Sequence, residues 1–121
     1  MMYKDFTEMP VWITAMEIAV EVFHLSCPLP KSEDYALKSQ IRRSAESVSA
    51  NIAEAFGRFH TKDKINFYYF AKGSAYETKS HLIYGQQTKY FNSTDIQNIC
   101  TKIDDCIHHI NKIIKTLDSK P

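Results

Sequence analysis

The most constraining feature of this sequence is a long row of isoleucines near its C-terminal end. Between residues 94 and 118 apolar side chains recur at alternating intervals of three and four, the repeat of a helix face that packs along its whole length. The row consists of Ile96, Ile99, Ile103, Cys106, Ile110, Ile113 and Leu117. A helix of about seven turns with such a face needs partner helices, so the isoleucines are predicted to point into a helical core.

Three further segments show helical periodicity, which predicts helices at residues 10–26, 34–59, 61–90 and 94–118. Pro10 suits the first turn of a helix, and Thr61 has the chemistry of a cap. Thr94 and Gln97 have the spacing of a capping box. The second helix has an alternative start, in which residues 32–34 form a short turn and the helix begins near Leu37.

Length and composition are those of one globular domain. The chain has 121 residues, 44% of them hydrophobic, and only three glycines and four prolines. Four helices with short connections predict an all-α fold, an up-down-up-down antiparallel four-helix bundle formed by residues 1–121. The opening MMYKDFTEMP lacks the apolar run of a signal peptide, and no stretch approaches the roughly 20 apolar residues of a membrane span. We therefore expect a cytoplasmic protein without a membrane partner.

Two of the predicted helices carry more than one packing face. In residues 61–90 a second apolar face follows Tyr69, Tyr76 and Ile83 at intervals of seven. In residues 34–59 the face opposite the core consists largely of small residues between Arg43 and Gly57, which would let another backbone approach closely. These faces predict a homo-oligomer. The alternative is a compact bundle that buries its central hairpin on several sides.

Polar residues of the central hairpin are predicted to form a structural network. The turn falls near residue 60, and Arg43 and Glu77 lie 17 residues to either side of it, so antiparallel packing brings them to the same height. We expect an ion pair between them, with Asn51 and Glu54 bridging neighbouring groups. Such pairs fix register more than they add stability.

No catalytic, cofactor or metal site is predicted. A di-iron bundle needs matched Glu-x-x-His pairs on two helices, whereas Glu77 with His81 and Asp105 with His108 do not match each other. A helical RNase with an Arg-to-His motif is excluded because no histidine follows Arg42, Arg43 or Arg58 at the required spacing. An active site between subunits remains the alternative, and a purely structural assembly protein is a third.

The charge distribution leaves a nucleic-acid partner open. The net charge is +1, but residues 38–89 carry nine basic and four acidic side chains. Phosphate contacts are expected from Arg42, Arg58, Lys62, Lys64, Lys72 and Lys79. At the hairpin tip, Phe59 and His60 could stack on unpaired bases. The alternative is that the acidic first segment, residues 1–37, neutralises the hairpin.

Two motifs carry a family resemblance: QIRRSAESVSANIAEAFGR from Gln40, and AKGSAYE from Ala71. The chain resembles the four-helix bundle family encoded by intervening sequences in bacterial 23S ribosomal RNA genes. The matching positions are Gln40, Arg42, Arg43, Ser47, Asn51, Ile52, Ala53, Glu54, Gly73, Ser74 and Glu77, together with Val11-Trp12, Leu29-Pro30, Glu33 and Tyr35. One departure is Ala55, where the family usually has glycine.

The resemblance implies a closed bundle that assembles as a ring-shaped homopentamer. It also implies similarity to the accessory proteins of diversity-generating retroelements, which work with a reverse transcriptase and nucleic acid. The expected function is therefore that of a non-enzymatic oligomeric scaffold, with RNA or a nucleic-acid enzyme as its expected partner.

Overall fold

The computed structural model describes residues 3–119, which form four long α-helices and no strand. The helices are α1 (Pro10–Ser26), α2 (Leu37–Gly57), α3 (Thr61–Gln87) and α4 (Ser93–Asp118), with short 3-10 turns η1 (Phe6–Glu8) and η2 (Lys31–Glu33). The predicted all-α fold is confirmed. Within the described residues, no helix combines the length and the apolar character needed to cross a membrane.

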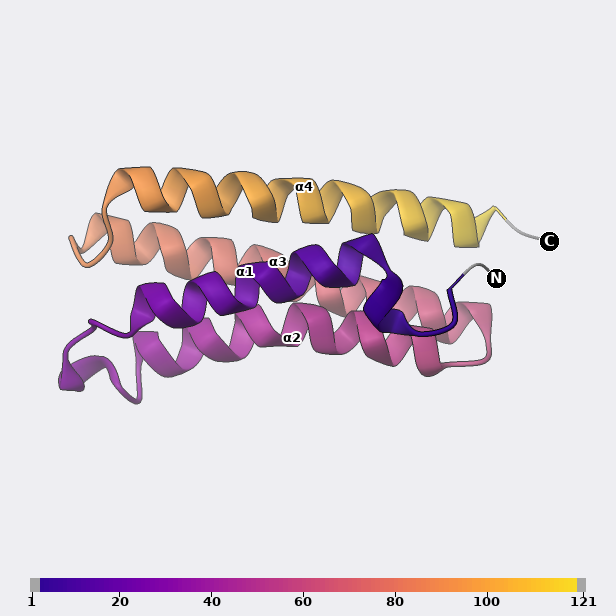
Figure 1. Ribbon diagram of the computed structural model, residues 1–121, viewed down its shortest axis with the longest axis horizontal. Coiled ribbons are helices and arrows are strands. Elements are labelled where there is room, and N and C mark those ends of the chain that lie inside the picture. The colour runs from indigo at the N-terminus through magenta and orange to yellow at the C-terminus, as the bar shows by residue number, and fades with distance from the viewer. Residues whose placement is uncertain (1–2, 120–121) are drawn as a thin grey trace.

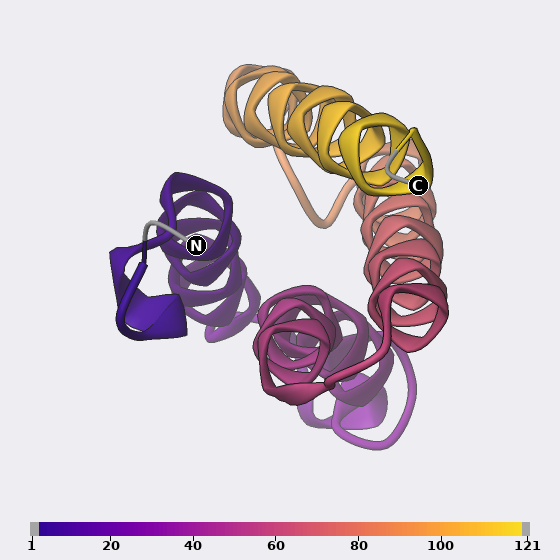
Figure 2. The ribbon, with the colours of Figure 1, turned by 90° about the vertical axis from the view of Figure 1, so that its right-hand side faces the viewer.

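Successive helices run in opposite directions along the bundle (Figure 1). Each packs against the next, and α4 packs back against α1, so α1 and α3 occupy one diagonal and α2 and α4 the other (Figure 2). Helix α4 crosses the others obliquely: it begins on the side of α1 and ends over α3 (Figure 2). This tilt separates α4 from α1 at the end of the bundle where both chain termini lie.

The isoleucines of α4 point into the core, as the sequence predicts. Ile103 and Ile110 are 1% and 0% exposed. Toward the end of the helix Ile107 and Ile114 are buried, while Ile113 and Leu117 are only partly buried. A strict 3-4 repeat averages 3.5 residues per turn, so it drifts across the face of a straight α-helix with 3.6. The drift turns the last members of the row toward the side of α4.

Two predicted helix boundaries are wrong by three residues, while α2 ends two residues before the predicted end and α4 begins one residue before the predicted start. Helix α2 begins at Leu37 rather than at residue 34, because the preceding residues form η2, and the alternative start is the one observed. Helix α3 ends at Gln87 rather than at residue 90. The backbone N–H groups of Tyr90 and Phe91 both donate to the Gly85 carbonyl, at 2.8 and 3.1 Å, while Lys89 has a φ of 72°. This left-handed residue stops the helix.

Two predicted caps are also wrong. Thr61 is the first residue inside α3, and the capping position belongs to His60, whose side chain makes no capping bond. Helix α4 is capped by Asn92, whose Oδ1 accepts from the Asp95 N–H at 2.8 Å. Asparagine is at least as good a cap as threonine, so the helix starts before Thr94.

Candidate functional site

The small side chains of α2 lie against α3. Thr78 Oγ1 lies 2.9 Å from Ser44 Oγ, and Ser74 Oγ lies 2.9 Å from Ser47 Oγ. Ser44 and Thr78 are completely buried. Hydroxyl groups of this size let two helix backbones approach while their polar atoms stay hydrogen-bonded. Part of the face that we expected to lie outside the bundle is thus used within it.

Arg43 and Glu77 meet across the same hairpin. The Arg43 guanidinium donates to a Glu77 carboxylate oxygen, and His81 Nε2 lies 3.2 Å from that oxygen. Both side chains of the ion pair are substantially exposed, so it stabilises the bundle only modestly. Glu77 is therefore paired with the Arg43 cation, and His81 contacts the same carboxylate oxygen. Among residues 3–119 no group of three or more His, Cys, Asp or Glu side chains is arranged to hold a metal ion.

The other two residues of the predicted network behave differently. Asn51 Nδ2 donates to the Ser47 carbonyl at 2.8 Å and contacts Ser47 Oγ at 3.0 Å, so it bonds within α2 to the residue whose hydroxyl contacts Ser74 of α3. Glu54 instead pairs with Arg58 of its own helix end at 2.9 Å. Among residues 3–119, Glu54 makes no hydrogen bond to the neighbouring backbone or tyrosine groups that it was expected to bridge. The hydroxyl contacts were missed by the sequence analysis, although Ser44 and Thr78 lie almost symmetrically about the turn.

Two of the predicted phosphate contacts are engaged between helices. Arg42 Nε donates to Ser26 Oγ at 2.8 Å, and its guanidinium lies 4.2 Å from the centre of the Phe23 ring. Lys79 Nζ donates to Asp104 of α4 at 2.7 Å, and this hydrogen bond raises the pKa of the lysine. Arg42 and Lys79 therefore hold α1 and α4 against the central hairpin.

Two more of the predicted phosphate contacts have partners near the hairpin tip. Arg58 pairs with Glu54 and lies 4.6 Å from the centre of the Phe67 ring. Lys64 Nζ donates to two backbone carbonyls at the C-terminal end of α2, at 3.1 and 3.2 Å. A cation in this position satisfies carbonyls that the helix leaves open and complements its dipole.

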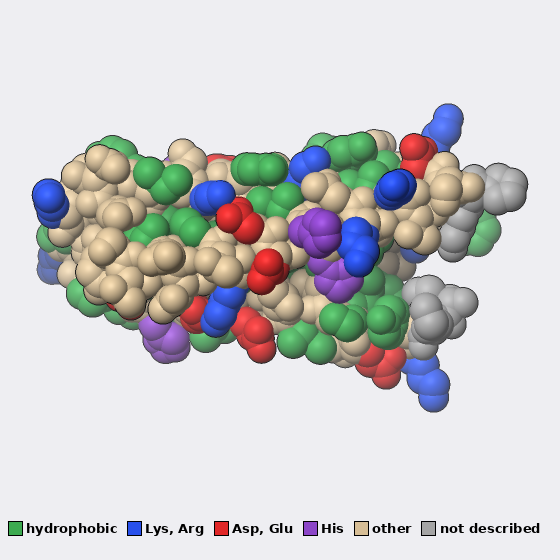
Figure 3. Space-filling view, turned by 90° about the horizontal axis from the view of Figure 1, so that it is seen from above, with side chains coloured by type: hydrophobic (Ala, Val, Ile, Leu, Met, Phe, Trp, Pro, Cys, Tyr) green, Lys and Arg blue, Asp and Glu red, His purple; other side chains and the backbone are tan. Residues whose placement is uncertain are grey.

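The remaining two predicted phosphate contacts are Lys62 and Lys72, which make no ion pair with residues 3–119. Lys72 lies 5.9 Å from the centre of the Tyr69 ring. Basic side chains elsewhere alternate with acidic ones, and Figure 3 shows this mixture over α4. Phe59, at the hairpin tip, is 89% exposed, with His60 edge-on to its ring at 5.1 Å.

The most extended apolar surfaces lie on α1 and α3. On α3, Tyr69 and Tyr76 are each 52% exposed and Ile83 is 42% exposed. We call these three residues the α3 stripe. The predicted second face of α3 is thus on the surface, and the compact-bundle alternative for it is wrong.

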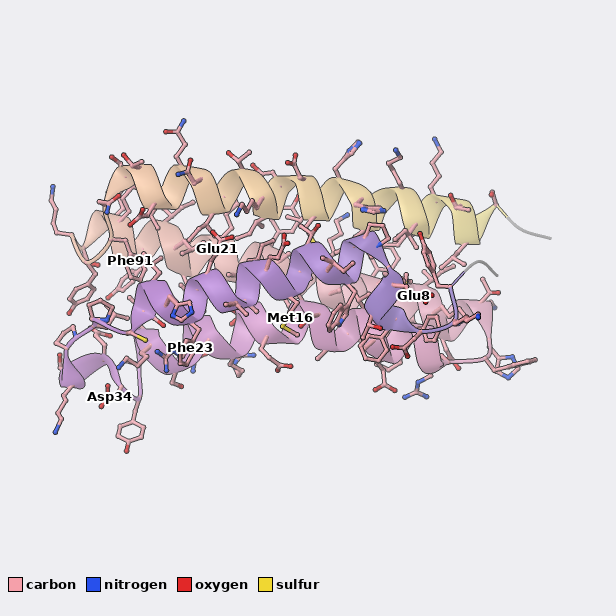
Figure 4. The ribbon with its side chains drawn as sticks, in the orientation of Figure 1. Glu8, Met16, Glu21, Phe23, Asp34 and Phe91 are labelled. Atoms are coloured by element: carbon pink, nitrogen blue, oxygen red, sulfur yellow. The ribbon has the colours of Figure 1, made fainter. Side chains whose placement is uncertain are left out.

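Helix α1 has a matching surface that the sequence analysis missed. Its core face is made by Val11, Ala15, Ile18 and Val22. The α1 stripe, on the other side, consists of Ile13, Met16, Val20 and Phe23. Figure 4 shows Met16 and Phe23 directed away from α4, whereas Glu21 points toward it and pairs with Lys102. The signal was present in the sequence, because α1 carries more apolar residues than one face can bury.

Comparison with known proteins agrees with this fold. A family model described as 23S rRNA-intervening sequence protein matches residues 7–112. The chain is also similar to the crystal structure of a protein of unknown function from the S23 ribosomal protein family of Bacteroides thetaiotaomicron, with 27% identity and a TM-score of 0.81. That similarity covers 87% of this chain and 98% of the other. Comparison with curated proteins gave no significant match.

Proposed function

This chain belongs to the 23S rRNA-intervening sequence protein family, and we propose that it is a non-enzymatic cytoplasmic scaffold in which several bundles join head to tail in a ring. The observation that carries the proposal is the pair of exposed apolar stripes on α1 and α3. Contiguous apolar surface of this kind marks an interaction site on a soluble protein.

The two stripes lie on opposite sides of the bundle, which favours a head-to-tail contact. Helices α1 and α3 sit on one diagonal (Figure 2). The α1 stripe is on the side of its helix opposite the core, and the α3 stripe is rotated by about 100° from the buried face of α3. A contact between unlike surfaces is heterologous, and it closes into a ring when the rotation between copies divides a full turn. The family resemblance suggests that five copies close the ring.

The stripes also overlap in height along the bundle, although Ile83 of the α3 stripe extends about 9 Å beyond the level of Phe23. Arg42 contacts Phe23 while its neighbour Arg43 contacts Glu77, so Phe23 and Glu77 are level. From this level the α1 stripe extends over ~15 Å to Ile13, and α3 reaches Tyr69 after ~12 Å in the same direction, at 1.5 Å per residue. Helices α1 and α3 run parallel, so a rotation about an axis along the bundle would bring the stripes together without a large shift.

A mass measurement tests assembly. Light scattering on the purified chain should give several times 14.0 kDa at micromolar concentration. Tyr76→Glu and Val20→Glu should each reduce the mass, because each places a charge in an apolar contact. Asn98→Glu is the matched control, because it adds the same charge at an exposed position of α4. A wild-type protein that stays monomeric would refute the proposal.

Mixing the two variants tests the head-to-tail geometry. The Val20→Glu protein keeps an intact α3 stripe and the Tyr76→Glu protein keeps an intact α1 stripe. Mixed together they should form a 1:1 heterodimer and nothing larger, because each has one functional surface. Like-to-like contacts would instead let one of the variants dimerise alone, and that result would contradict the ring.

A second candidate activity, binding of single-stranded RNA, is favoured by the exposed aromatic pair Phe59 and His60 beside Lys62. Unpaired bases stack on aromatic rings, and a ring of subunits would repeat this tip and strengthen weak contacts by avidity. Titration of unstructured RNA at low and moderate salt should show binding that falls with salt. Phe59→Ala with Lys62→Glu should remove it, and equal binding by this variant would exclude the tip.

A further inference from the structure

The end of the bundle that faces the viewer in Figure 2 contains a pocket whose lining includes neither the stripes nor Phe59, His60 and Lys62 of the hairpin tip. It lies between the segment around η1, the α2–α3 turn and the last turns of α4, and its volume is about 460 Å³. Small-molecule sites in proteins typically have about 300–1,000 Å³. The tilt of α4 away from α1 provides the space.

The walls of this pocket are mainly apolar. Met9 and Phe56 line one side, and Ile113 and Leu117 of α4 line the other. These two α4 residues are the members of the isoleucine row that drift out of the core, so they present apolar surface to the pocket. An apolar wall of this kind favours a hydrocarbon ligand over a sugar or a nucleotide.

One buried polar group opens into the pocket. The Tyr68 side chain is 4% exposed, and its hydroxyl makes no hydrogen bond with the other residues of 3–119. Among residues 3–119, every side-chain nitrogen or oxygen that is fully shielded from solvent has a hydrogen-bond partner. Because the Tyr68 hydroxyl has no such partner, it is not fully shielded, and it is accessible from the pocket that Tyr68 lines. Burial raises the pKa of Tyr68 to about 12, so the hydroxyl is a protonated donor at neutral pH and also in mildly alkaline solution.

The charged groups that line the pocket are cationic among residues 3–119. They are Lys64 and Lys112, and no acidic side chain of these residues lines it. Lys64 is fixed by its two bonds to carbonyls of α2, which leaves one N–H of its ammonium group for a ligand. Residues four apart lie on the same side of a helix, with Cβ atoms about 6 Å apart, so Lys64 and Tyr68 can donate to one anionic group.

We propose that this pocket binds a monocarboxylate with a medium-length hydrocarbon tail. The carboxylate accepts from the Tyr68 hydroxyl and from the Lys64 ammonium group, and Lys112 adds positive charge at the opening. The tail lies between Phe56 and the α4 residues Ile113 and Leu117. This site is independent of ring formation and of RNA binding.

Calorimetric titration of the full chain with decanoate tests the site, with 1-decanol and butyrate as matched ligands. Decanoate should bind with a Kd on the order of 10–100 μM. Decanol lacks the charge and butyrate most of the tail, so each should bind at least about tenfold more weakly. No binding of decanoate at 1 mM, or equal binding of decanol, would overturn the proposal.

Two variants locate the binding. Tyr68→Phe removes only the hydroxyl and should weaken decanoate binding by about tenfold, while Tyr76→Phe on the outer face of the same helix should leave it unchanged. Thr116→Trp, at an exposed position that lines the pocket, should block the cavity. Circular dichroism checks that each variant is folded. Decanoate binding that survives both Tyr68→Phe and Thr116→Trp in folded proteins would place the ligand elsewhere.

Discussion

Replacing Gly85 by alanine should destabilise the bundle, although alanine is the better helix former. Gly85 is buried in the last turns of α3, and a Cβ there would lie 2.3 Å from two carbons of the Phe91 ring. That ring is itself 5% exposed. Ordinary contact begins at about 3.4 Å, so the ring would have to move by roughly 1 Å.

The two effects of this substitution can be compared. Exchanging glycine for alanine inside a helix stabilises it by about 1 kcal/mol. Overpacking a filled core costs about 1–3 kcal/mol, and expelling the Phe91 ring altogether would cost about 3–5 kcal/mol. Subtracting the helix gain leaves a net cost of about 0–2 kcal/mol if the ring shifts and about 2–4 kcal/mol if it is expelled, so we expect Gly85→Ala to lower the free energy of unfolding by up to about 4 kcal/mol.

The same substitution at Gly73 is the matched control. Gly73 lies in the same helix, and a Cβ there would meet nothing within 4 Å, so Gly73→Ala should raise the free energy of unfolding by up to about 1 kcal/mol. Urea unfolding at one protein concentration gives both values, since assembly makes stability depend on concentration. A Gly85→Ala protein as stable as Gly73→Ala would refute the packing argument.

Two further predictions concern charge. Reversing the charges of both Arg43 and Glu77 should cost less stability than the sum of the two single reversals. The coupling should be about 0.5–1 kcal/mol because the pair is partly exposed. Zero coupling would show that the contact does not contribute to stability. Burial raises the pKa of the Cys106 thiol from 9.0 to about 11, so the unfolded thiol ionises first as the pH rises, and stability should fall by roughly 2 kcal/mol between pH 9 and 11. Cys106→Ala should remove that part of the loss, and an unchanged pH profile would contradict it.

Sequence periodicity was sufficient for the core but not for the surface. The 3-4 repeat of α4 identifies Ile103 and Ile110 because burial along a straight helix follows its period directly. Equal distances from the hairpin turn were enough to pair Arg43 with Glu77. The α1 stripe was missed because a helix with apolar residues on several sides has no unique face, and only the packed neighbours show that Val20 and Phe23 lie outside.

Side-chain partners between helices were the least predictable part of the candidate site. Arg42 and Lys79 were expected to face solvent, yet they contact Phe23 and Asp104 on neighbouring helices. Such contacts depend on how far each helix is rotated about its own axis, which the spacing of charges does not determine. The predicted caps at Thr61 and Thr94 are wrong for a different reason. Several residues whose side chains could cap a helix lie close together in the sequence, and only the backbone conformation selects one of them.

The large side chains that α3 exposes beside the central hairpin determine how strongly the bundles associate. Serines and alanines fill the α2–α3 contact, while Tyr69 and Tyr76 are half exposed. Covering about 80 Å² of each tyrosine would contribute about 2 kcal/mol at 25 cal/mol per Å². We therefore expect Tyr76→Ala to weaken each contact about 30-fold and to shift the midpoint of assembly to higher protein concentration by a similar factor. Unchanged assembly in a dilution series would exclude Tyr76 from the contact.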